Sequence, residues 1–200
     1  MVDPRVHTLG VVWMVVACAT PPPAPPPPAP VAVVTGAERF LPLRDATVFA
    51  YETESQTTGE RGMLVLEVRR PRSELAELVV AGRVRRLEVT AAGIQHVEGG
   101  WLLKEPLSIG ASWPGDFGSV QVTALDRAVT TPAGTFTDCL ETAESASGPN
   151  FTKKTTTTYC PQVGIVLRHT EVESDEGAGV ETIRLKSHGP RVDVVGPGAP

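Results

Sequence analysis

The sequence predicts an all-β, mainly antiparallel domain: a single curved meander sheet that forms an open or half-closed barrel, with little helix. Between about Phe40 and Ser187, short segments rich in Val, Leu, Thr and aromatic residues alternate with turn residues, and no helical period is sustained. Turn signals recur at intervals of about 8 to 12 residues, which predicts roughly ten strands.

Individual segments support this fold class. Residues 86–90 and 120–124 alternate polar with apolar side chains, as strands with one buried face do. The segment 73–80 is ambiguous, because Ser73 could cap a short helix. We favour a strand there and keep the helix as the alternative. The threonine run 155–158 predicts an exposed or edge strand.

A weak internal repeat marks the start of two expected strands. In residues 42–49 and again in 106–113, a Pro-Leu pair is followed at equal spacing by a small residue and then an aromatic residue. Ala46 and Gly110 are the small residues, which would permit a tight bend before the first large core side chain. Because the repeat rests on four positions, chance is an equal alternative.

The N-terminal residues indicate export. Residues 9–16 form an apolar run that is too short to span a bilayer as a helix and is typical of a signal peptide. The following stretch, Val15-Val16-Ala17-Cys18, resembles the lipobox of bacterial lipoproteins. The resemblance implies a diacylglycerol thioether on Cys18, cleavage before it and acylation of the new N-terminus. A buried structural cysteine in a first helix is the alternative.

Composition then divides the chain into four parts. Residues 1–17 are the expected signal peptide, and residues 18–37 are the lipidated cysteine with a Pro/Ala-rich spacer, which favours extended polyproline II. Residues 38–188 are the β domain, and residues 189–200, rich in Gly and Pro, are a flexible tail. By resemblance to Gram-negative lipoproteins, the lack of Asp after the cysteine favours the outer membrane.

Charge argues against a nucleic-acid partner. The net charge is -5, and no dense Lys/Arg run is present to follow a phosphate backbone. Arginines do cluster in residues 69–72 and 83–86, with acidic residues nearby. We interpret the clusters as solvated strand faces, with an anion site as the alternative.

Cys139 and Cys160 remain as a pair once Cys18 is acylated. Residues 148–151, Gly-Pro-Asn-Phe, form a good type I turn. A hairpin folded symmetrically about this turn pairs Cys139 with Cys160, Leu140 with Tyr159 and Phe136 with Val163. Directly opposed strand residues lie within disulfide range, so we predict a bridge in an oxidising compartment.

Two motifs resemble a pattern that recurs in uncharacterised bacterial periplasmic domains and lipoproteins. They are Pro-Ala-Gly-Thr-Phe at 132–136 and Pro-Gln-Val-Gly-Ile-Val at 161–166, together with the Pro-Leu pairs. Gln162 and Ala46 stand where the pattern often has Gly. The resemblance implies an open or half-closed antiparallel sheet, distantly similar to the LolA/LolB-like carriers that sort outer-membrane lipoproteins. It implies no enzymatic activity.

No catalytic, metal or cofactor signature is present in the sequence. His96, His169 and His188 occur singly, without the spacing of a ligand set, and no nucleophile elbow or phosphate loop is found. The acidic residues of 171–176 lack the spacing of a calcium loop and predict a solvated turn. We therefore expect no enzyme, no cofactor and no metal.

Two functional hypotheses remain. The first is a carrier or binding module whose concave apolar face holds a lipid, an acyl chain or an extended peptide. The second is a structural or assembly lipoprotein that acts through protein contacts, with an exposed strand edge as the handle. Plain core packing is the simpler account of the aromatic residues assigned to the apolar face. These residues are Phe49, Trp101, Trp113, Phe136 and Tyr159.

Overall fold

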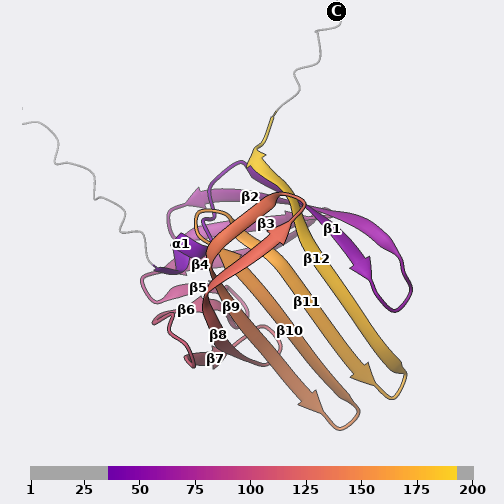
Figure 1. Cartoon of the computed structure of the whole chain (residues 1–200). Coiled ribbons are helices and arrows are strands. Elements are labelled where there is room, and N and C mark those ends of the chain that lie inside the picture. Colours follow the sequence, from indigo (N-terminus) through magenta and orange to yellow (C-terminus); the bar gives the residue numbers. More distant parts are fainter. Residues whose placement is uncertain (1–35, 193–200) are drawn as a thin grey trace, which may run out of the picture. The chain divides into compact units, whose positions relative to one another are not determined.

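Alternation of inward apolar and outward polar residues builds one twelve-stranded antiparallel sheet, which curls into a nearly closed barrel (Figure 1). The computed structural model describes residues 36–192. Its one described helix, α1 (Gly36–Phe40), has five residues, and no helix in this range is long and apolar enough to cross a membrane. The strands are β1 (Thr47–Ser55), β2 (Arg61–Arg72), β3 (Leu75–Val80), β4 (Arg83–Thr90), β5 (Gly93–His96), β6 (Trp101–Lys104), β7 (Ser112–Pro114), β8 (Ser119–Thr131), β9 (Gly134–Gly148), β10 (Phe151–Cys160), β11 (Gly164–Ser174) and β12 (Gly177–Pro190).

The strand order divides the sheet into two six-stranded halves. It runs β6-β5-β4-β3-β2-β1-β12-β11-β10-β9-β8-β7, so consecutive strands pair throughout except β6 and β7. The first strand instead pairs with the last. The expected antiparallel meander is confirmed, whereas the expected count of ten strands is wrong. Three strands, β5 to β7, have only three or four residues, which is too short to display an alternating pattern.

Side chains and a close backbone approach link β6 to β7 where no ladder joins them. The indole Nε1 of Trp113 donates a hydrogen bond to the carbonyl oxygen of Trp101, at 3.2 Å. Gly100 lies directly against the backbone of Gly115, since a Cβ atom at Gly100 would fall 1.7 Å from the Gly115 carbonyl oxygen. A residue with a side chain could not be accommodated there without moving one of the two turns.

The predicted strand faces are confirmed for most segments. Leu87, Val89, Val120 and Val122 are all buried. Segment 73–80 forms β3 rather than a helix, although the strand begins only at Leu75. The expectation for the threonine run was wrong, because β10 lies in the middle of the second half. Three threonines of this run are buried: Thr155, Thr157 and Thr158.

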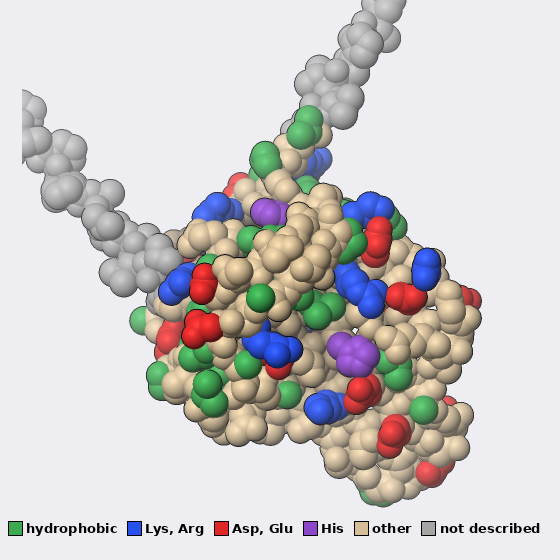
Figure 2. Space-filling model, in the orientation of Figure 1, with side chains coloured by type: hydrophobic (Ala, Val, Ile, Leu, Met, Phe, Trp, Pro, Cys, Tyr) green, Lys and Arg blue, Asp and Glu red, His purple; other side chains and the backbone are tan. Residues whose placement is uncertain are grey.

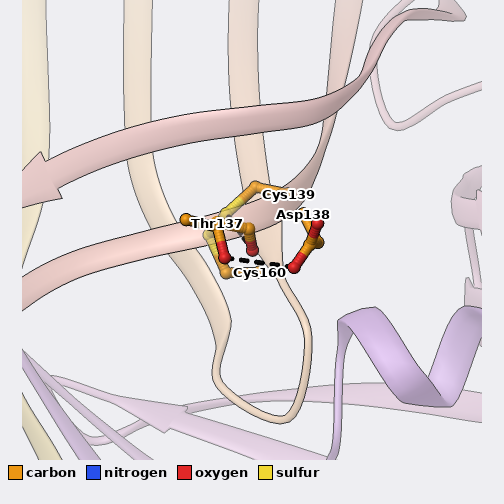
Figure 3. The surroundings of a disulfide bond; sticks show 4 residues. All are labelled: Thr137, Asp138, Cys139 and Cys160. Atoms are coloured by element: carbon orange, nitrogen blue, oxygen red, sulfur yellow. Dashed lines mark hydrogen bonds between the residues drawn. A yellow bond between two sulfur atoms is a disulfide. The ribbon is translucent and has the colours of Figure 1, made fainter.

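The β9–β10 hairpin has the register that its turn predicts. Gly148 pairs with Phe151, and the ladder continues to Leu140 and Tyr159. The next pair, Cys139 and Cys160, forms a disulfide with a Cα–Cα distance of 4.2 Å. Figure 3 shows the bond between the two strands, beside Thr137 and Asp138.

Beyond the disulfide the predicted pairing of Phe136 with Val163 does not form. Asp138 has φ 56°, and the resulting irregularity turns β9 away from β10, so that Phe136 pairs with Val129 of β8 instead. The β8–β9 turn then reaches β12, where the backbone N–H of Ala133 donates to the carbonyl oxygen of Leu185.

The two Pro-Leu segments share a pattern of backbone hydrogen bonds, although the peptide bond before the proline is cis only at Pro106. In the first, the N–H of Arg44 donates to Pro42 O and that of Thr47 to Arg44 O; in residues 106–111 the equivalent two bonds recur at the same spacing. Ala46 and Gly110 both have positive φ, at 55° and 83°. The repeat therefore reflects a shared loop that leads into β1 and into β7.

The C-terminal boundary of the sheet differs slightly from prediction. β12 continues to Pro190, which pairs with Thr47, so the first two residues of the expected tail 189–200 belong to the sheet. Residues 193–200 lie outside the described range, as do residues 1–35, which include the predicted signal peptide, Cys18 and most of the spacer.

Candidate functional site

The two halves of the barrel line a cavity of about 700 Å³ that opens to solvent on one side. This volume lies within the range of roughly 300 to 1,000 Å³ that is usual for small-molecule sites. Both halves contribute side chains to its wall, so the cavity exists only because the sheet curls and its first and last strands pair.

Strands β1 to β3 make one wall of the cavity apolar. Leu64, Leu66 and Leu78 face inward but remain partly exposed, because the space they face is not filled by other side chains. At the end near α1, Leu41 and Leu43 complete this wall. Apolar surface of this kind gains about 25 cal/mol for each Å² that a ligand removes from water.

The facing wall, from β9 to β11, carries a row of polar groups. Thr142, Thr157 and Arg168 are direct cross-strand partners on the three strands, and all three line the cavity. The hydroxyl of Tyr159, one inward position further along β10, interacts with the side chains of both threonines. Burial, the larger effect, raises the pKa of Tyr159 to about 12, although Arg168 opposes the shift.

Charged residues from both halves meet where the β7–β8 turn reaches the cavity. Asp116 lies 3.4 Å from the guanidinium Nη1 of Arg85 and 3.9 Å from Nε2 of His96. Burial lowers the pKa of His96 below its usual range, against the attraction of Asp116. The imidazole is therefore neutral at neutral pH, and the contact with Asp116 is not an ion pair there.

The same turn is fixed to β9. One carboxylate oxygen of Glu144 accepts hydrogen bonds from the backbone N–H groups of Phe117 and Gly118, at 2.7 and 3.0 Å. The ammonium of Lys153 lies 4.0 Å from the centre of the Phe117 ring, a cation–π contact. These contacts hold Phe117 in the cavity wall.

Comparisons with known proteins find similar folds but no family. No protein-family model and no curated protein matches the chain. Among solved structures, a Bacteroides fragilis protein provisionally described as exported, with a YmcC-like fold, matches at a TM-score of 0.47 and 13% identity, covering 75% of this chain and 98% of its own. A Parabacteroides distasonis protein provisionally described as a lipoprotein matches at a TM-score of 0.44 and 14% identity, with the same coverage.

Of the five aromatic residues assigned to a ligand face, three line the cavity: Phe49, Trp101 and Tyr159. The other two do not. Trp113 is buried in the core at the β6–β7 junction, and Phe136 packs against the core from β9. The structure therefore places three of the five residues in the cavity wall and two outside it, and the ligand face itself stays a prediction.

The arginine clusters serve two purposes. Arg69 and Arg86 form ion pairs with acidic residues, as a solvated strand face would, whereas Arg70 pairs with Glu38 at a largely buried position. Arg83 and Arg85 instead contribute to the cavity wall. Figure 2 shows charges of both signs interspersed over the face it presents, without one continuous basic patch.

No sequence motif predicts the polar groups of the cavity. Arg168 stands in a strand whose residues alternate without a motif, and Thr142 and Glu144 do likewise in β9. Only the register of three strands shows that they share a wall. Among residues 36–192, no group of three or more His, Cys, Asp or Glu is placed to hold a metal ion.

Proposed function

We propose that this protein is a lipid-anchored protein of the cell envelope whose barrel binds an apolar ligand, a lipid or an acyl chain. The observation that carries the proposal is the cavity of about 700 Å³ with its wall of partly exposed leucines. Each methylene moved from water into such a wall contributes about 0.8 kcal/mol before the costs of association. The proposal assigns the domain a binding role and no reaction.

The assembly role is the alternative, with protein contacts in place of a ligand. A strand edge was its expected handle, and the two edge strands β6 and β7 have only four and three residues. Short edges are poor templates for adding a strand, and Trp113 already spans the junction between them. For this reason we rank ligand binding first.

Binding is tested with a hydrophobic fluorescent probe and with palmitate as a competitor. Leu66→Trp adds bulk inside the cavity, and Val65→Trp is the matched control, because Val65 is the neighbouring residue on β2, 52% exposed and outside the cavity wall. We expect Leu66→Trp to weaken binding about tenfold, equivalent to about 1.4 kcal/mol, and Val65→Trp to leave it unchanged. A wild-type protein that binds neither probe nor palmitate, or equal losses in both variants, would contradict the proposal.

The anchor is tested by metabolic labelling with radioactive palmitate in the native host. Cys18→Ser removes the sulfur that the lipobox resemblance assigns to the lipid, so labelling should disappear and the precursor should accumulate. A chain with Cys139→Ala and Cys160→Ala is the control, and it should be labelled as the wild type is. Labelling that persists in Cys18→Ser would exclude the anchor while leaving ligand binding untouched.

A further inference from the structure

Arg168 occupies a central place in the cavity wall. It lies on β11, between β10 and β12, and pairs directly with Thr157. Arg168 is only partly exposed, and it lines the cavity together with the leucines of the opposite wall. A guanidinium group is charged at every pH at which a protein is folded, so this position brings a permanent positive charge to a largely apolar space.

The charge of Arg168 has no partner within the described part of the chain. Its Nε is the one buried side-chain nitrogen or oxygen in residues 36–192 without a hydrogen bond, and its guanidinium forms no ion pair with a carboxylate there. A buried polar group without a partner is unfavourable, and a charged group more so. Nε itself is closed off from solvent, but a ligand that enters the cavity can bring a negative charge to the guanidinium group as a whole.

The acidic groups of the cavity are engaged elsewhere. Asp116 interacts with Arg85, and Glu144 accepts two backbone N–H groups of the β7–β8 turn. Two further cations, Arg83 and Lys153, line the same cavity without a carboxylate within ion-pair distance among the described residues. Four cationic and two acidic side chains therefore line the cavity, which gives it an excess of positive charge although the chain as a whole is acidic.

We propose that the ligand is an anionic single-chain amphiphile whose carboxylate or phosphate head binds Arg168 while its acyl chain lies against the leucine wall. This inference rests on the proposed function and specifies its ligand class. The planar guanidinium can donate two parallel hydrogen bonds to either oxyanion. The hydroxyl groups of Thr142 and Thr157 lie in the same cross-strand row and are within the same wall.

The experiment compares three ligands with the same chain: palmitate, hexadecyl phosphate and hexadecanol. Their affinities are measured by displacement of a fluorescent probe from the wild type and from Arg168→Gln and Arg168→Lys. The wild type should bind at least one of the two anions about tenfold or more tightly than the alcohol, because a hydrogen bond between two charged groups is stronger than one to a neutral hydroxyl. Which anion is preferred distinguishes a carboxylate from a phosphate head.

Arg168→Gln should abolish this preference and keep the affinity for hexadecanol, and Arg168→Lys should restore part of it, because lysine keeps the charge without the planar fork. Arg127→Gln is the control: Arg127 is an arginine of β8, paired with Glu141 and outside the cavity wall, and its replacement should change nothing.

Equal binding of the anions and the alcohol to the wild type would overturn the inference, even if Arg168→Gln failed to fold. A preference that survives in Arg168→Gln would overturn it as well. In both cases binding of the alcohol would leave the proposed function standing. If none of the three ligands binds the wild type, the proposed function itself fails.

Discussion

At the scale of single residues, the two tyrosines report on the interior of the barrel. Tyr51 and Tyr159 are the only tyrosines of the chain, and both are buried and line the cavity. The hydroxyl of Tyr51 donates to the carbonyl oxygen of Ile165 at 3.1 Å, which joins β1 to β11 through the interior. Burial, with the nearby Tyr159 as a second cause, raises the pKa of Tyr51 well above its usual range.

These shifts predict the alkaline behaviour of the protein. Both phenols have a higher pKa in the folded state than in the unfolded chain, so their contribution to stability is complete below pH of about 10 and is lost as the pH rises toward 12. We expect the phenolate absorbance at 295 nm to stay flat through pH 10 and then rise together with the loss of far-ultraviolet circular dichroism. In concentrated guanidinium chloride both groups should ionise near pH 10. An exposed tyrosine is half ionised at pH 10, so about a quarter of the full phenolate signal at that pH, in a protein with native dichroism, would show that one of the two tyrosines is exposed.

At the scale of secondary-structure elements, the sequence predicted correctly those features that depend only on residues close together in the chain. The turn at 148–151 fixed the register of β9 with β10, and with it the disulfide, since pairing on an antiparallel ladder follows from the turn alone. The prediction failed at Phe136, where one residue with positive φ redirects the strand. A bulge of this kind has no reliable sequence signal when the residue is Asp rather than Gly.

Two other positions with positive φ are ones where the pattern of periplasmic domains and lipoproteins described above often has Gly. Ala46 and Gln162 stand where that pattern often has Gly, and both have positive φ, at 55° and 63°. Glycine adopts this conformation without the steric cost that a Cβ atom brings. Both turns therefore adopt the left-handed conformation although a side chain is present, and the backbone N–H of Gln162 donates a hydrogen bond to the carbonyl oxygen of Arg39 in α1.

The candidate site was much less predictable than the strands. Sequence reasoning selected aromatic residues for their size, but size alone does not distinguish a cavity wall from a core, and the structure places Trp113 and Phe136 outside the cavity wall. Arg168 was missed because its importance depends on long-range closure of the sheet. An arginine in an alternating strand is usually outward and solvated, and only the barrel turns this one inward.

At the scale of the whole molecule, the two six-stranded halves share one hydrophobic core. The core cluster includes Phe49, Leu87 and Leu103 from the first half and Leu140 and Leu185 from the second. The β1–β12 ladder joins the halves on one side, and the bond from Trp113 to Trp101 joins them on the other, across β6 and β7. Tyr51 with Ile165 and Arg85 with Asp116 are further contacts between the halves. Neither half can bury its inner face alone, so the molecule should unfold as one cooperative unit.

Removal of the disulfide tests this cooperativity, because Cys139 and Cys160 both belong to the second half. The two cysteines are separated by 21 positions in the sequence, and the disulfide closes the loop between them. Replacing both cysteines by Ala should therefore lower the free energy of unfolding by about 3 kcal/mol. Fluorine NMR of protein labelled with 5-fluorotryptophan follows Trp101 of β6 and Trp113 of β7 separately during urea unfolding. If the shared core couples the halves, both signals must shift to the same lower midpoint, although Trp101 lies in the half without the bridge. If the Trp101 midpoint stays at the wild-type value while the Trp113 midpoint falls, the two halves unfold independently. The cavity, which needs both halves, would then be lost as soon as one half unfolds.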